Sequence, residues 1–144
     1  MGKRREGREA AVQFLFQDDL NKSDPAALAQ VLEEFWHLRE SAAKTRQFAT
    51  ELIHGVLENH DAIDERIKRV TANYELHRIA AVDRNILRVA IYEMLFCNDV
   101  PPVVSINEAI EIAKRYGAEE SGRFVNGILD RVKLDLTRPS RTTS

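Results

Sequence analysis

The chain has 144 residues, of which 44% are hydrophobic and 31% charged, so it is expected to form one domain with a sizeable core. Its single cysteine, Cys97, excludes an internal disulfide and favours a reducing compartment. No apolar run approaches the roughly 18 residues of a membrane span, and the N-terminus lacks the apolar segment of a signal peptide, which predicts a cytoplasmic protein.

The net charge of −2 hides a basic N-terminus. The first eight residues hold four cations against one acid, a local balance of +3: Lys3, Arg4, Arg5 and Arg8 against Glu6. A basic arm on an acidic body is typical of proteins that bind nucleic acids. A solvated, unstructured terminus explains the charge equally well, so charge alone leaves both interpretations open.

Apolar residues repeat at helical spacing along most of the chain, and no segment alternates for long enough to predict a strand. The pattern predicts seven helices, over residues 4–20, 25–39, 43–59, 61–73, 77–97, 104–116 and 119–135. Residues 137–144 are polar and are expected to form a disordered tail. We therefore expect a single all-α domain over residues 1–136.

Capping residues and glycines predict where several helices begin and end. Ser23-Asp24-Pro25 places a cap before a proline, and Ser105 with Glu108 forms a Ser-x-x-Glu capping box. Gly117 is expected to take the left-handed conformation after the helix over 104–116. Asn126-Gly127 is a turn signal, but the apolar spacing continues across it. We expect one helix there, in which Gly127 lets another helix approach closely.

No group of residues predicts catalysis or metal binding. No two of the four histidines are spaced i, i+4, and Cys97 has no neighbouring cysteine. Adjacent carboxylates such as Glu119 and Glu120 point apart on a helix. A glycine-rich phosphate loop and a Gly-x-Ser-x-Gly motif are both absent from the sequence. We expect neither an enzyme nor a bound metal or other cofactor.

Two segments carry residues suited to RNA, and the first is the start of the first helix. Arg4 and Arg8 share a helix face with Arg5 beside them, because residues four apart are neighbours on a helix. Lys3 and Gln13 extend the polar surface. An arginine-rich helix start favours contact with phosphates.

The second segment is the corner between the last two predicted helices, where Tyr116 and Phe124 flank residues 117–120. Single-stranded RNA is commonly held by stacking bases on aromatic side chains beside polar groups such as Glu120. The alternative is that both aromatics are core residues under the corner. Position favours the core for Phe124, which heads an apolar row, and is neutral for Tyr116.

Three motifs cover much of the chain: RREGREAAVQFLFQ at residues 4–17, VDRNILRVAIYEML at 82–95 and SINEAIEIAKRYGAEESGRFVNGILD at 105–130. In this order and spacing the chain resembles the NusB family of bacterial transcription antitermination factors. The resemblance implies an all-α fold of about seven helices in two packed three-helix groupings. It also implies a binding function without catalysis.

The resemblance further implies two partners. With NusE, a ribosomal small-subunit protein, the family recognises the boxA element of single-stranded nascent RNA. The complex joins elongating RNA polymerase and opposes early termination, notably on ribosomal RNA operons. The implied RNA contacts are Arg4, Arg5, Arg8 and Gln13, with Lys3 beside them, and Tyr116, Glu120 and Phe124 at the corner. The implied NusE contacts are Phe16, Leu20 and Asp83.

Two departures from the family pattern concern these contacts. Glu6 interrupts the basic run, which weakens the expected phosphate contact, and Phe16 lacks the hydroxyl that relatives often carry there.

Other functions stay open. A helical interaction or dimerisation module without specific RNA binding is the main alternative, and a homodimer is a further assembly that the sequence leaves undecided. A NusB-like domain also occurs ahead of an RNA methyltransferase, but this sequence shows no Rossmann pattern or glycine-rich cofactor loop.

Overall fold

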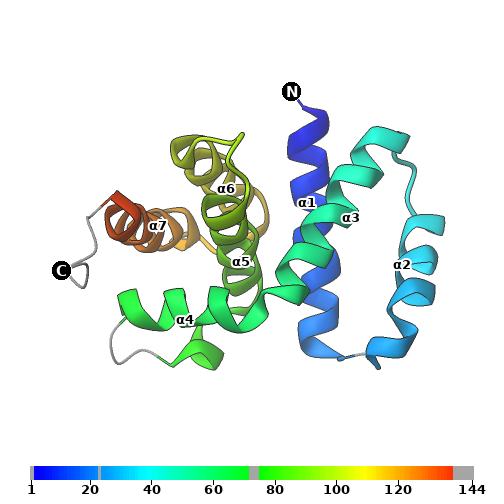
Figure 1. The fold of residues 1–144 in the computed structure, drawn as a ribbon, viewed down its shortest axis with the longest axis horizontal. Helices are drawn as coiled ribbons and strands as arrows, with labels where there is room; N and C mark the ends of the chain where they lie inside the picture. The colour runs from blue at the N-terminus through cyan, green and yellow to red at the C-terminus, as the bar shows by residue number, and fades with distance from the viewer. Residues whose placement is uncertain (1, 23, 72–74, 138–144) are drawn as a thin grey trace.

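The computed structural model describes residues 2–22, 24–71 and 75–137, and within them no strand is present (Figure 1). The elements in chain order are α1 (Lys3–Leu20), the 3₁₀ turn η1 (Pro25–Ala27), α2 (Leu28–His37), α3 (Ala43–Glu58), α4 (His60–Thr71), the 3₁₀ turn η2 (Leu76–Arg78), α5 (Ala81–Phe96), α6 (Pro102–Tyr116) and α7 (Ser121–Thr137). The predicted all-α class is confirmed. The predicted tail lies outside the described residues, except for Thr137, which ends α7.

Helix α5 lies at the centre of the molecule and contacts α1, α3, α4, α6 and α7. It separates α1, α2 and α3 on one side from α4, α6 and α7 on the other, as the two groupings in Figure 1 show. Buried side chains from both groupings meet in one core, among them Phe14, Ile53, Leu87, Ile112 and Leu129. None of the described helices has the length and apolarity that crossing a bilayer requires.

Three predicted helices, α2, α5 and α7, begin later than the apolar spacing indicated, and local structure accounts for the first two. Asp24 accepts a hydrogen bond from the Ala26 amide as the predicted cap, but residues 25–27 form a 3₁₀ turn before α2. The helix predicted from residue 77 begins at Ala81, because residues 79 and 80 are extended, with ψ of 133° and 138°. The Arg84 guanidinium donates to the carbonyls of residues 76 and 79 and so stabilises this turn.

The predicted capping box is wrong. Helix α6 begins at Pro102, where a missing N–H costs nothing because the first helical amides have no partner within the helix. Ser105 is therefore inside the helix and buried, and its hydroxyl donates to Glu93 Oε1 at 3.4 Å. Glu108 binds Arg5 instead of an amide of its own helix.

Both predictions about glycine conformation and packing are wrong. Gly117 is extended, with φ −93° and ψ −171°, so it is not a left-handed cap. Helix α7 is continuous across Asn126-Gly127 as predicted, but Gly127 is exposed and a Cβ there would meet no atom within 4 Å. The close approach occurs at Gly55, where a Cβ would lie 2.1 Å from the Tyr92 ring.

Candidate nucleic-acid interface

The basic start of the chain is helical from Lys3 onward, so the unstructured alternative is wrong. Lys3 and Arg4 are exposed. The Arg4 guanidinium lies 3.7 Å from Asp99 and 4.9 Å from the centre of the Phe48 ring. With a side chain 57% exposed and one loose ion pair, Arg4 keeps donor groups available to solvent.

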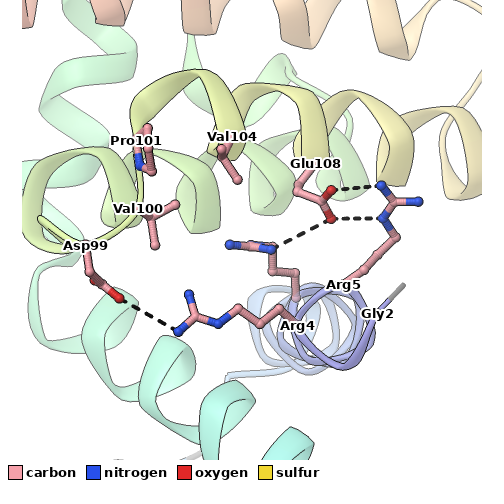
Figure 2. Close-up of a pocket in the computed structure, with 9 residues that line it drawn as sticks. Gly2, Arg4, Arg5, Asp99, Val100, Pro101, Val104 and Glu108 are labelled. Atoms are coloured by element: carbon pink, nitrogen blue, oxygen red, sulfur yellow. Dashed lines mark hydrogen bonds and ion pairs between the residues drawn. The ribbon is translucent and has the colours of Figure 1, made fainter.

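Arg5 forms a two-pronged ion pair with Glu108 of α6. Its Nε and Nη2 donate to Glu108 Oε1 and Oε2 at 2.9 and 2.8 Å, as Figure 2 shows. These hydrogen bonds lower the pKa of Glu108 and raise the pKa of Arg5, although partial burial opposes both shifts. Both groups are therefore charged over the whole ordinary pH range.

Arg8 is directed into the protein. Its Nε and Nη2 both donate to the Glu93 carboxylate at 2.9 Å, and the two side chains are 5% and 1% exposed. The pair joins α1 to α5 in the core, and Arg8 Nη1 also lies 3.7 Å from Glu108. Arg8 thus lies beneath the exposed basic residues, and its guanidinium presents no free edge to solvent.

A cavity of about 280 Å³ opens where the start of α1 faces the start of α6. One side is apolar, from Val100, Pro101 and Val104. The α1 side carries three arginines, Arg4, Arg5 and Arg8, and the two acids, Asp99 and Glu108, come from the same loop and helix as the apolar residues (Figure 2). The cavity therefore combines an apolar wall with fixed charges of both signs.

The corner between α6 and α7 presents a mixed aromatic and polar surface. Tyr116 is 38% exposed, and Phe124 is half-buried and packs against the main core. Glu120 is exposed, with its carboxylate 3.5 Å from Arg123. Of the two aromatics, Tyr116 offers the larger share of its ring to a ligand.

Two residues that the sequence analysis missed join this corner to the basic start. Glu9 is nearly buried, and it accepts a hydrogen bond from Arg115 Nη1 at 3.1 Å and a longer one from the Tyr116 hydroxyl at 3.5 Å. The Arg115 guanidinium also lies 5.5 Å from the centre of the Tyr116 ring. The contact brings together segments that lie more than 100 residues apart in the sequence.

Gln13, the other residue predicted near the arm, lies one turn beyond Glu9 on α1. It is half-buried, and its side-chain oxygen accepts a hydrogen bond from Arg39 Nη1. The Arg39 guanidinium lies 5.2 Å from the centre of the Phe35 ring. Gln13 therefore faces the end of α2, away from the cavity at the start of α1.

The residues predicted to contact a partner protein lie at the opposite end of α1 and at the start of α5. Leu20 is 62% exposed, Phe16 is half-buried, and Asp83 is only 8% exposed. The Asp83 Oδ1 atom is buried without a hydrogen-bond partner among the described residues. A buried carboxylate oxygen that lacks a hydrogen bond lowers the stability of the fold. Asp83 is therefore not a solvated surface charge.

A buried polar network fixes these two helix ends to each other. Asp19 Oδ2 of α1 accepts hydrogen bonds from three side chains of α5: Arg84 Nε at 2.8 Å, Arg88 Nη1 at 3.0 Å and Asn85 Nδ2 at 3.1 Å. Arg88 also donates to both carboxylate oxygens of Asp64 on α4, at 2.9 and 3.0 Å. The network holds three helices in register.

Nothing in the described part of the chain assembles a metal site, since no three His, Cys, Asp or Glu side chains gather closely enough to hold an ion. Cys97 is half-buried, and this burial raises the pKa of its thiol. A raised pKa disfavours the thiolate that a reactive cysteine needs.

The sequence and the fold are both similar to those of known proteins. The NusB family matches residues 5–133. A transcription antitermination protein NusB of Desulfotalea psychrophila is 48% identical over 136 residues, which cover 92% of this chain and 96% of that protein. The fold is similar to that of a solved T. maritima NusB, with a TM-score of 0.81 and 47% identity over 92% of this chain and 91% of that one.

A second solved structure is of antitermination factors NusB and NusE in complex with double-stranded RNA. The similar chain in it has a TM-score of 0.78 and 26% identity, over 94% of this chain and 98% of that one.

Proposed function

The chain belongs to the NusB family of transcription antitermination proteins, which are not enzymes, and we propose that it binds boxA RNA together with NusE. The complex then joins elongating RNA polymerase in the cytoplasm and opposes early termination, notably on ribosomal RNA operons. The 26% identical structure that holds NusB, NusE and RNA supports the choice of partners.

The observation that carries the proposal is the link through Glu9. It supports the proposal because Glu9, on the same helix as the exposed cations Lys3 and Arg4, contacts Arg115 and Tyr116 at the end of α6. A single RNA strand crossing this surface meets phosphate-binding groups at Lys3 and Arg4 and a stacking surface at Tyr116. Phe124 adds part of its ring, and Glu120 offers a carboxylate to base amino groups.

The proposal is tested by titrating a fluorescent boxA-like RNA with the protein, with and without NusE, against a scrambled RNA of the same composition. We expect specific binding that becomes tighter when NusE is present. NusE binding with equal affinity for both RNAs would instead support the alternative of an interaction module without specific RNA recognition.

The salt dependence of binding is expected to depend on Lys3 and Arg4. Each phosphate contact on a single strand contributes about −0.7 to the slope of log affinity against log salt. Replacing both residues by Ala should therefore make the slope shallower by about 1.4. The matched control replaces two exposed lysines on α4 and α7, Lys68 and Lys133, and should leave the slope unchanged. Equal slopes for both double variants would show that Lys3 and Arg4 do not contact RNA phosphates.

Phe124 is expected to contribute to both the fold and RNA binding. Because it is only half-buried, Phe124→Ala should destabilise the protein by about 2 kcal/mol, below the range for a fully buried Phe. Phe124→Leu keeps most of the apolar volume but removes the aromatic face. Thermal unfolding of this variant should be nearly normal, while RNA binding weakens by about 1–3 kcal/mol. Normal RNA binding by the Leu variant would restrict Phe124 to the core and leave the corner to Tyr116 and Glu120.

A further inference from the structure

We propose that Glu108 competes with RNA phosphate for the Arg5 guanidinium and so limits the RNA affinity of this surface. The inference rests on the proposed function, because it describes how that same surface is held when RNA is absent. It assigns to Glu108 a role in setting affinity that is separate from holding the helices together.

The first argument is the geometry of the pair. Glu108 occupies the Nε and Nη2 donors of Arg5 at 2.9 and 2.8 Å, which is the planar edge that a phosphate takes in a two-pronged contact. The side chain of Arg5 is 33% exposed, so a phosphate can approach it from solvent. A phosphate and Glu108 cannot both bind this edge.

The second argument is that Arg5 differs from its two neighbours. Arg4 has a loose ion pair with Asp99 at 3.7 Å, a guanidinium 4.9 Å from the centre of the Phe48 ring and a side chain 57% exposed, so no carboxylate holds it in a two-pronged contact. Arg8 is 5% exposed and fixed to Glu93. Of these three arginines, Arg5 combines access from solvent with a carboxylate bound in ideal geometry.

The third argument concerns what happens to Glu108 when Arg5 leaves it. Arg8 Nη1 lies 3.7 Å from Glu108 Oε1, so the carboxylate is within ion-pair distance of both Arg5 and Arg8. Glu108 therefore keeps a cation beside it after Arg5 turns toward RNA. Moving Arg5 from Glu108 to RNA therefore leaves no partly buried charge without a counter-charge, and this lowers the free-energy cost of the move.

Glu108 could instead strengthen RNA binding, and the two possibilities predict opposite changes in RNA affinity when its carboxylate is removed. If Glu108 instead orients Arg5 so that its remaining donors face RNA, removing the carboxylate weakens binding. Competition predicts the reverse.

The experiment measures binding of the boxA-like RNA, with NusE present, to Glu108→Gln, which replaces the carboxylate by a neutral group of the same shape. We expect affinity to rise roughly tenfold, the size of one charge-assisted hydrogen bond. The matched control is Glu111→Gln on the same helix, which removes the same charge from a side chain 47% exposed and paired with Lys114. The control should change affinity by less than about twofold. Equal gains in both variants would mean a general charge effect and overturn the proposal.

A double-mutant cycle with Arg5→Gln decides whether the gain passes through Arg5. Competition requires that Glu108→Gln gives no gain when Arg5 is already absent. A gain that persists in the Arg5→Gln background, or a loss of affinity in Glu108→Gln alone, contradicts the proposal. Glu108→Ala serves as a second variant if thermal unfolding shows that Gln disturbs the fold. Absence of boxA preference in the unmodified protein would overturn the proposed function itself, a result distinct from a missing gain.

Discussion

Replacing Arg8 by Ala is expected to destabilise the protein by about 3–5 kcal/mol, because Glu93 is left charged and unpaired in the core. Glu93 is 1% exposed, and its two carboxylate oxygens accept both strong hydrogen bonds from Arg8. Among the residues that the structure describes, the Ser105 hydroxyl at 3.4 Å is the other hydrogen-bond partner of Glu93, and it carries no charge to offset the carboxylate. Unfolding in guanidinium chloride, followed by circular dichroism, measures the loss.

Arg4→Ala is the matched control for this prediction. It removes the same side chain four residues earlier, but from an exposed position with one loose ion pair at 3.7 Å and a contact with the Phe48 ring. An exposed ion pair contributes at most about 1 kcal/mol, so this variant should unfold almost normally. Replacing Arg8 and Glu93 together by Met should recover much of the lost stability, since no buried charge remains. Equal stability of Arg8→Ala and Arg4→Ala would contradict the structural role of Arg8.

Arg88→Met is expected to have an effect of similar size, about 3–5 kcal/mol, at the other end of α1. Arg88 is 6% exposed and joins Asp19 of α1 to Asp64 of α4. Met keeps the apolar contacts of the long side chain but leaves two nearly buried carboxylates without their shared cation. Denaturant unfolding measures the loss, and Arg78→Met, at an exposed site, is the control.

The pH dependence of stability should change in the same variant. Burial alone would raise the pKa of Asp19, but hydrogen bonds from Arg84 and Asn85 and the charge of Arg88 lower it below its ordinary value of 3.8. A lowered folded-state pKa contributes stability that is present above pH 3.8 and is lost as the pH falls through the folded-state value. Arg88→Met should therefore lose less stability than the unmodified protein between about pH 5 and 2. Parallel curves would show that Arg88 does not stabilise the Asp19 charge.

The helices could be predicted because each buries an apolar stripe whose spacing is local to the sequence. Some of their ends depend on tertiary contacts, and several of those were predicted wrongly. Ile79 fits the apolar spacing of α5, but it is buried in an extended segment that Arg84 holds from the following helix. Ser105 has the spacing of a cap, but α6 begins earlier, at Pro102.

The candidate interface could be predicted only in part, because sequence shows which charges are near each other along the chain and not which ones pair in space. In the sequence, Arg5 and Arg8 have no evident partner. In the structure they pair with Glu108 and Glu93, which lie 103 and 85 residues away along the chain. Glu9 was missed for the same reason: its role appears only when Arg115 is beside it. The prediction that Phe124 is partly core agrees with its half-buried position.

The central claim is that the start of α1 and the corner of α6 and α7 form one RNA-binding surface. The most direct test is to follow backbone amide chemical shifts while boxA-like RNA is added to the labelled protein in complex with unlabelled NusE. The account predicts that shifts in residues 3–9 and in residues 115–124 change together and saturate at the same RNA concentration. Changes confined to one of the two segments, with the other unaffected at saturation, would contradict it.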